Sequence, residues 1–201
     1  MPKSPNYPLI IGQAAESLGS GYMTFVAALT VASDPRALAL APTTNPGFIV
    51  PTGAVSRKDG TEHTYNFRHY LAQAATNSAL IEEFKKVWLG GAILNLGDAL
   101  AAHKFFDHAP EIEMIYHLRN GIAHGNKFKF DDGGRRRLKT YPANNSFAFI
   151  KGDQSAAFAI STSLAGATVL FDFMEAGDVL DLLMSVGLYL IRMGNGDPLR
   201  P

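Results

Sequence analysis

The stretch PEIEMIYHLRNGIAHGN, residues 110–126, sets the fold of this chain. Its apolar residues recur every three or four positions, which predicts a helix over about 111–124 with one buried stripe. Pro110 suits the first helical turn, and Gly125 suits the left-handed position that follows a helix. Two glutamates in the first turn lie where the helix dipole favours a carboxylate. The apolar stripe consists of Met114, Ile115, Leu118 and Ile122.

Apolar residues at helical spacing predict further helices on both sides of this stretch. Gly90 and Gly91 are expected to separate two of them, and Asp178 is expected to cap the last. Residues 41–63 are rich in Pro, Gly, Thr and Asn, which predicts a long loop. The expected helices cover about 14–32, 64–88, 92–105 and 178–193.

Beyond Gly125 the pattern changes to short segments with aromatic and β-branched residues, separated by Asp-Asp-Gly-Gly, Asn-Asn and Gly-Asp turns. These segments predict a small antiparallel β-sheet, in a β-rich insert over about 127–173 before the C-terminal helix. The expected fold class is therefore α+β and predominantly α. We expect a single domain over 1–201, whose helical part covers about 14–125 and 178–193.

Composition narrows the class of protein. The 201 residues are 47% hydrophobic and 18% charged, as in one soluble globular domain. The absence of cysteine excludes disulfides and thiolate metal sites, and it is compatible with a cytoplasmic location. The longest apolar segment contains Asp181 and is shorter than the roughly 20 residues that cross a bilayer, so no membrane span is expected. Because the net charge is zero, nucleic-acid binding would need a local basic patch.

Arg119, Asn120 and His124 bring three polar groups to the end of the predicted helix. Asn120 lies one turn before His124 on the same face, whereas Arg119 lies about 140° around and about 7.5 Å along the axis. A guanidinium, an amide and an imidazole can thus converge on one phosphate. The same residues can also simply finish a helix, with His124 at the negative end of the dipole and Arg119 paired with an upstream glutamate. Both interpretations stay open at this point.

The segment LRNGIAHGN, residues 118–126, resembles the RN(x)3H signature of the HEPN superfamily. These α-helical domains occur in RNA-cleaving toxins, abortive-infection proteins and RNA-guided nucleases. The resemblance covers about residues 64–130. It implies a HEPN-like helical bundle that forms a homodimer, cleaves RNA without metal or cofactor in a defence or toxin–antitoxin setting, and has an antitoxin or regulatory protein as partner.

The resemblance assigns Arg119, Asn120 and His124 as catalytic residues. His124 would move a proton to or from the reacting RNA oxygens, and Arg119 would stabilise the charge on the phosphorane. Asn120 would orient the histidine or the phosphate. Toxins inactivated by nucleotidylation carry a tyrosine two residues after the histidine, where this chain has Asn126, so that form of control is not expected. The alternative is a non-catalytic HEPN-like module that binds a nucleotide or a protein.

Two further groups of residues carry chemistry in the sequence. A basic run after the motif can contact RNA phosphates, or it can be the solvated edge of a hairpin. A group of histidines and carboxylates over residues 103–117 fits no metal template, so no metal is assigned, and a metal-dependent hydrolase is the third functional class. The candidate RNA-binding residues are Lys127, Lys129, Arg135, Arg136 and Arg137.

Overall fold

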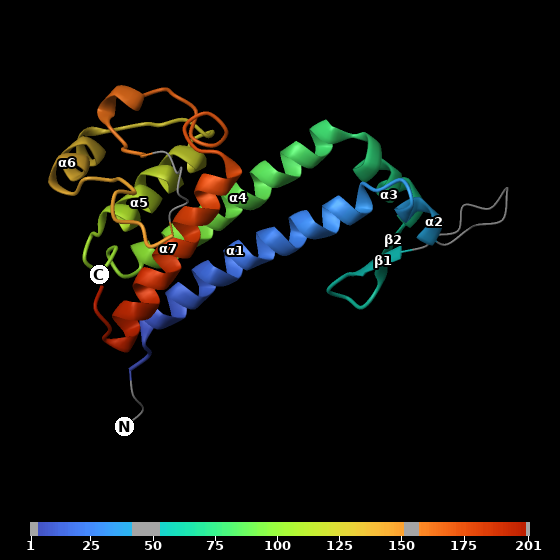
Figure 1. Cartoon of the computed structure of the whole chain (residues 1–201), viewed down its shortest axis with the longest axis horizontal. Helices are drawn as coiled ribbons and strands as arrows, with labels where there is room; N and C mark the ends of the chain where they lie inside the picture. Colours follow the sequence, from blue (N-terminus) through green and yellow to red (C-terminus); the bar gives the residue numbers. More distant parts are fainter. Residues whose placement is uncertain (1–3, 42–52, 151–156, 200–201) are drawn as a thin grey trace. The chain divides into compact units, whose positions relative to one another are not determined.

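The computed structural model describes residues 4–41, 53–150 and 157–199 (Figure 1). Helices dominate the described part, and it contains one two-stranded antiparallel sheet. The predicted class, α+β and predominantly α, is confirmed. None of the helices in the described part has the length and apolar character that a membrane span needs.

The chain divides into two compact units. Unit 1 comprises residues 1–22 and 86–201, and unit 2 comprises residues 23–85. The single-domain organisation stays a prediction. The helices of unit 1 are the first part of α1 (Tyr7–Ala32), the second part of α4 (Ser78–Ala101), α5 (Pro110–Ala123), α6 (Asp132–Thr140), the 3-10 helix η1 (Thr162–Leu164) and α7 (Ala176–Asn195).

The core of unit 1 is built from α4, α5 and α7. Three of the four residues of the predicted stripe of α5, Met114, Ile115 and Leu118, are fully buried, and the fourth, Ile122, is half-buried. Each fully buried side chain contributes roughly 1.5–3 kcal/mol by leaving water. The facing residues of α4 and α7 are equally buried: Leu89, Ile93, Leu96 and Leu100 on α4, and Val179, Leu182, Leu183, Val186 and Leu190 on α7.

Helix α7 lies across the first part of α1 (Figure 1). Glycines of the two helices form the contact between them. A Cβ added to Gly12 would lie 2.7 Å from the carbonyl oxygen of Gly187 and 2.9 Å from the backbone nitrogen of Ile191. A Cβ added to Gly187 would lie 3.1 Å from the carbonyl oxygen of Gly12. The two backbones therefore touch directly, and no larger residue fits between them.

Several predicted helix boundaries are wrong. Helix α1 begins at Tyr7 and not near residue 14, and the helix predicted over 64–88 is divided at Asn77 into α3 (Phe67–Thr76) and α4. Helix α4 continues through Gly90 and Gly91, because its flanking residues are buried and packing outweighs the low helix propensity of glycine. Helix α7 begins after Glu175, which forms a capping box with Asp178, so Asp178 is the third helical residue and not the cap. At its other end, α7 ends at Gly196 in the left-handed conformation.

The predicted position of the sheet is wrong as well. The described residues between 127 and 173 form only isolated bridges, α6 and η1. The Asp-Asp-Gly-Gly sequence begins a helix instead of a turn, because the Asp131 side chain accepts a hydrogen bond from the nitrogen of Gly134 at 2.6 Å. Part of the predicted segment around residues 151–156 lies outside the described residues.

The sheet lies in unit 2, mostly within the stretch predicted as a loop, and Thr64 and Tyr65 of its second strand belong to the stretch predicted as a helix. Strands β1 (Gly53–Ser56) and β2 (Glu62–Tyr65) pair antiparallel, and Asp59 and Gly60 form the turn between them. Asp59 accepts hydrogen bonds from the backbone and hydroxyl of Thr61, and Gly60 has a φ of +83°. The other elements of unit 2 are α2 (Ala37–Leu40), α3 (Phe67–Thr76) and the remaining parts of α1 and α4, while residues 42–52 of the predicted loop lie outside the described residues.

The glycine contact predicts opposite effects for one substitution at two positions. Gly12→Ala should destabilise the fold by about 1–3 kcal/mol, because its Cβ meets backbone that cannot rotate away. Gly91→Ala is the matched control: its Cβ meets nothing within 4 Å, so higher helix propensity should stabilise by up to about 1 kcal/mol. Urea unfolding followed by circular dichroism measures both. Equal effects of the two substitutions would contradict the packing described here.

Candidate functional site

The motif stands at a tightly built helix end. His124 is the C-cap of α5, and its backbone N–H donates to the carbonyls of Asn120 and Gly121 at 3.2 Å each. Gly125 and Asn126 follow with φ values of +85° and +60°, so the chain turns back on itself. The Asn126 side chain then exchanges two hydrogen bonds with the backbone of Leu170, at 2.9 and 3.2 Å. These bonds fix the backbone that carries the exposed His124 side chain.

Arg119 is held by the preceding helix. Its Nε and Nη2 donate to one carboxylate oxygen of Asp98 on α4, at 2.9 and 2.6 Å. Its Nη1 donates to the side-chain oxygen of Asn120 at 3.2 Å. The stem of Arg119 packs on Gly97, where an added Cβ would lie 2.6 Å from Cγ. The absence of a side chain at residue 97 therefore lets Arg119 lie along α4.

The structure brings some of the predicted site residues together and not others. Arg119 and Asn120 are hydrogen-bonded to each other, and the described residues show no hydrogen bond between the Asn120 and His124 side chains. Within the part of the chain that is described, the His124 imidazole forms no hydrogen bond or ion pair. Asp98 was missed, because one sequence does not reveal which residue of α4 lies opposite residue 119. The sequence analysis offered an upstream glutamate as the partner of Arg119, whereas the partner is an aspartate.

A buried ion pair lies at the other end of α5. The Glu113 side chain is fully buried, and both of its oxygens bind Arg137 of α6, at 2.6 and 2.7 Å. His108 Nδ1 lies 2.7 Å from Oε1 of the same carboxylate, and its ring stacks on Tyr141. Such a carboxylate requires a cation nearby, since a lone buried charge is strongly unfavourable. The pair therefore fastens α6 to α5.

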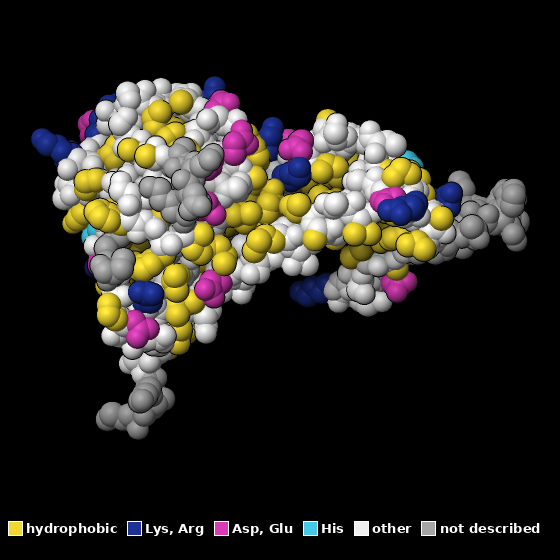
Figure 2. Space-filling model, viewed as in Figure 1, with side chains coloured by type: hydrophobic (Ala, Val, Ile, Leu, Met, Phe, Trp, Pro, Cys, Tyr) yellow, Lys and Arg dark blue, Asp and Glu magenta, His cyan; other side chains and the backbone are white. Residues whose placement is uncertain are grey.

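Arg137, one of the predicted RNA-binding residues, is engaged in contacts within the chain. Its guanidinium carbon lies 4.0 Å above the ring of Tyr116 and 4.6 Å from that of Phe105, besides the ion pair with Glu113. The other four basic residues are exposed: Lys127, Lys129, Arg135 and Arg136. On the face drawn in Figure 2, Lys and Arg side chains lie interspersed with Asp and Glu side chains. That distribution does not by itself define an RNA surface.

The histidine and carboxylate group over residues 103–117 is a packed network. His103 stacks on Phe106, and Asp107 accepts a hydrogen bond from the Tyr189 hydroxyl. No cluster of three metal-ligating side chains occurs in the described residues. His117 is buried, and its Nε2 has no hydrogen-bond partner there. Burial lowers the pKa of His117 to about 4, against which nearby Glu113 raises it.

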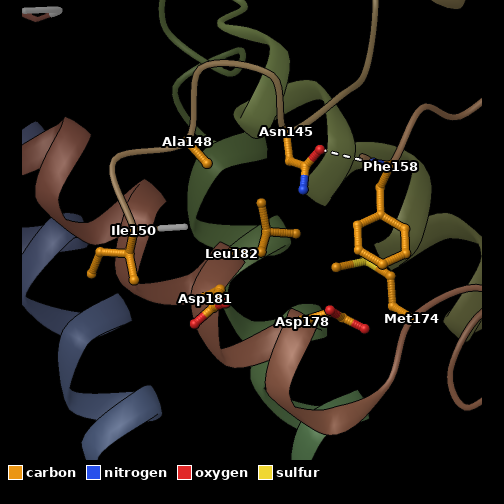
Figure 3. A pocket seen from close by; sticks show the side chains of 8 residues that line it. All are labelled: Asn145, Ala148, Ile150, Phe158, Met174, Asp178, Asp181 and Leu182. Atoms are coloured by element: carbon orange, nitrogen blue, oxygen red, sulfur yellow. Dashed lines mark hydrogen bonds between the residues drawn. The ribbon is translucent and has the colours of Figure 1, made fainter. Parts of the chain in front are cut away.

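A small hollow lies between α7 and the loop that contains Asn145 (Figure 3). Asp178 and Asp181 of α7 line it, and Asn145 accepts a hydrogen bond from the backbone of Phe158 at 2.8 Å. Burial, with Asp178 nearby, raises the pKa of Asp181. The hollow has a volume of about 10 Å³, which is room for about one water molecule, so it is no substrate site.

Comparison with protein-family models, curated proteins and solved structures finds no match for this chain.

The ion pair of Glu113 gives a test of how much Arg137 contributes to stability. Arg137→Ala should destabilise the protein by about 3–5 kcal/mol, because it leaves a buried carboxylate without its main cation. Arg136→Ala, the exposed neighbour on α6, should change stability by less than about 0.5 kcal/mol. Chemical unfolding of both variants measures these changes in the free energy of unfolding. A fully stable Arg137→Ala protein would contradict the proposed fastening of α6.

Burial of His117 predicts acid sensitivity. Its pKa of about 4 in the folded chain lies below the ordinary histidine pKa of 6.5, so the unfolded chain binds more protons between these two pH values. Its contribution to stability is complete above pH 6.5 and falls as the pH drops toward 4, with a slope approaching about 1.4 kcal/mol per pH unit. His117→Phe should reduce this slope. Urea midpoints of both proteins between pH 7.5 and 4.5 measure it, and identical slopes would refute the assignment.

Proposed function

We propose that this protein is a metal-independent endoribonuclease of the HEPN type, with Arg119, Asn120 and His124 at its active site. The observation that supports the proposal most is the accessibility of the reactive groups on one fixed helix end. His124 is exposed and the Arg119 side chain retains 35% of its accessible surface. A guanidinium has five N–H donors, and the three bonds to Asp98 and Asn120 leave one on each terminal nitrogen.

These groups suit cleavage by internal transfer. The ribose 2′-oxygen loses its proton and forms a bond to the adjacent phosphorus, while the bond from phosphorus to the 5′-oxygen breaks and that oxygen takes up a proton. His124 accepts the first proton or supplies the second. The free donors of Arg119 bind the phosphorane oxygens as negative charge develops. The products are a 2′,3′-cyclic phosphate and a 5′-hydroxyl.

The proposal includes a homodimer. One histidine does not readily act as acid and base in the same turnover, and a second copy of the helix end supplies another. RNA is the substrate, and no cofactor takes part. The proposed setting is a cytoplasmic defence or toxin system, in which an antitoxin or regulatory protein restrains the enzyme.

The contact between Arg119 and Asp98 favours a second candidate, a non-catalytic HEPN-like module. Asp98 neutralises the guanidinium in the same chain, so an RNA phosphate has to compete with a carboxylate at 2.6 Å. The Asp98 side chain keeps 61% of its accessible surface, however, and exposed pairs contribute only about 0–1 kcal/mol. Competition by phosphate therefore costs little, and we place the ribonuclease first.

An RNA cleavage assay tests the proposal. Purified protein with a chelator should cut single-stranded RNA and leave cyclic phosphate ends. His124→Ala and Arg119→Ala should each lower the rate by about 100-fold or more, because each removes a group that acts on the reacting phosphate. His63→Ala, which removes an exposed histidine of β2, is the matched control and should cut like the wild type.

The outcomes separate the candidates. Equal cutting by wild type and His124→Ala would refute the role of His124. Loss of all activity with the chelator would refute metal independence. A stable dimer that cuts none of the RNAs offered would support the non-catalytic module. Circular dichroism confirms that each variant is folded.

A further inference from the structure

A groove lies between α1 and α4 in unit 1, separate from the motif. Its volume of about 530 Å³ falls in the range of about 300–1,000 Å³ that is typical of small-molecule sites. The walls are mainly apolar, with two polar side chains. Residues that form the groove include Ile11, Ser17 and Leu18 on α1, and Trp88, Asn95 and Leu96 on α4.

Trp88 gives the groove an aromatic surface. It is the single tryptophan of the chain, and it keeps 39% of its accessible surface. A Cβ added to Gly21 of α1 would lie 3.2 Å from Cζ2 of Trp88, so the glycine makes room for the indole ring. Tryptophan stacks favourably on flat aromatic ligands, whichever base they carry.

The polar groups of the groove match the edge of a base. Asn95 is exposed and offers both a donor and an acceptor. The Ser17 hydroxyl donates to the carbonyl of Gln13 at 2.9 Å, which leaves its oxygen free to accept. A carboxamide pairs with adenine through the N6 donor and the N7 acceptor. The groove thus combines stacking with the hydrogen bonding that adenine requires.

The groove adjoins the proposed active site along α4. Asn95 and Asp98 are three residues apart, which is about 4.5 Å of helix rise and 60° of rotation. Asp98 binds Arg119 at 2.6 Å, so one face of α4 leads from the arginine to the groove. Trp88 lies ten residues from Asp98, about 15 Å of helix rise, so an RNA strand with one phosphate at Arg119 can direct a nearby base toward Trp88.

We propose that this groove binds an adenine base of the RNA substrate, stacked on Trp88 and hydrogen-bonded by Asn95. The position of the phosphate rests on the proposed function, whereas the base site rests on the groove itself. The occupied groove gives the enzyme a preference for adenine within about two nucleotides of the cleaved phosphate.

Fluorescence of the single tryptophan tests the proposal directly. The probe is a 2′-O-methyl oligoadenylate decamer, which cannot be cleaved because its 2′-oxygen is blocked. It should quench Trp88 emission saturably, and a 2′-O-methyl oligouridylate decamer should bind more weakly. Asn95→Leu should reduce the preference for the oligoadenylate by removing the hydrogen bonds while the exposed position tolerates leucine.

Variants of Trp88 give a second, independent measurement, made by anisotropy of the labelled decamer. Trp88→Ala should weaken binding about tenfold, because stacking on one base is lost. Trp88→Phe keeps an aromatic ring and should bind within about threefold of the wild type. Phe147→Ala removes an aromatic residue that is 61% exposed outside the groove, and it should bind like the wild type.

The outcomes distinguish this inference from the ribonuclease proposal. Cleavage that depends on His124, without any effect of Trp88 or Asn95 on binding, overturns the base site and leaves the ribonuclease. Quenching that depends on Asn95 in a protein that cuts no RNA supports the base site and refutes the ribonuclease. Trp88 emission that changes with protein concentration but not with oligonucleotide shows an interface between copies, and it overturns the base site.

Discussion

The buried carboxylate of Glu113 constrains how the chain packs around α5, the helix that carries the motif. A fully buried charge has to be matched by a cation, and Arg137 matches it with two hydrogen bonds between two aromatic rings. That requirement brings α6 back onto α5 and places His108 against the same carboxylate. Helix α5 is thereby held on the side opposite its buried stripe, so its C-terminal turn is presented to solvent in one orientation.

Arg119 also pairs with a carboxylate, but this pair lies at the surface. Its partner Asp98 is mostly exposed, so solvent screens the attraction and the pair can exchange for another anion at small cost. Arg137 is locked and structural, whereas Arg119 is oriented but available. Two arginines that look alike in the sequence differ in the burial of their carboxylate partners: Glu113 is fully buried, whereas Asp98 keeps 61% of its side-chain surface.

The sequence predicts those features that depend on local periodicity. The stripe of α5 and the amphipathic pattern of α7 were predicted because each buries one face. Long-range packing was not predictable: α4 continues through Gly90 and Gly91 because of residues buried around them, and α6 lies against α5 because Arg137 reaches Glu113. The sheet was misplaced because aromatic alternation indicates burial as readily as strand.

The candidate site also combines residues that the sequence predicts with residues that only long-range packing reveals. The motif residues were visible as a pattern, but the partner of Arg119 was not, because antiparallel packing of α4 on α5 fixes which residue lies opposite. No sequence motif marks the residues Asp98, Asn95 and Trp88. They become meaningful once α4 is one continuous helix, since spacings of three and seven residues then place them along adjoining faces. The two glycines led us to predict a break in α4. Because α4 is in fact continuous, it connects the arginine to the aromatic groove.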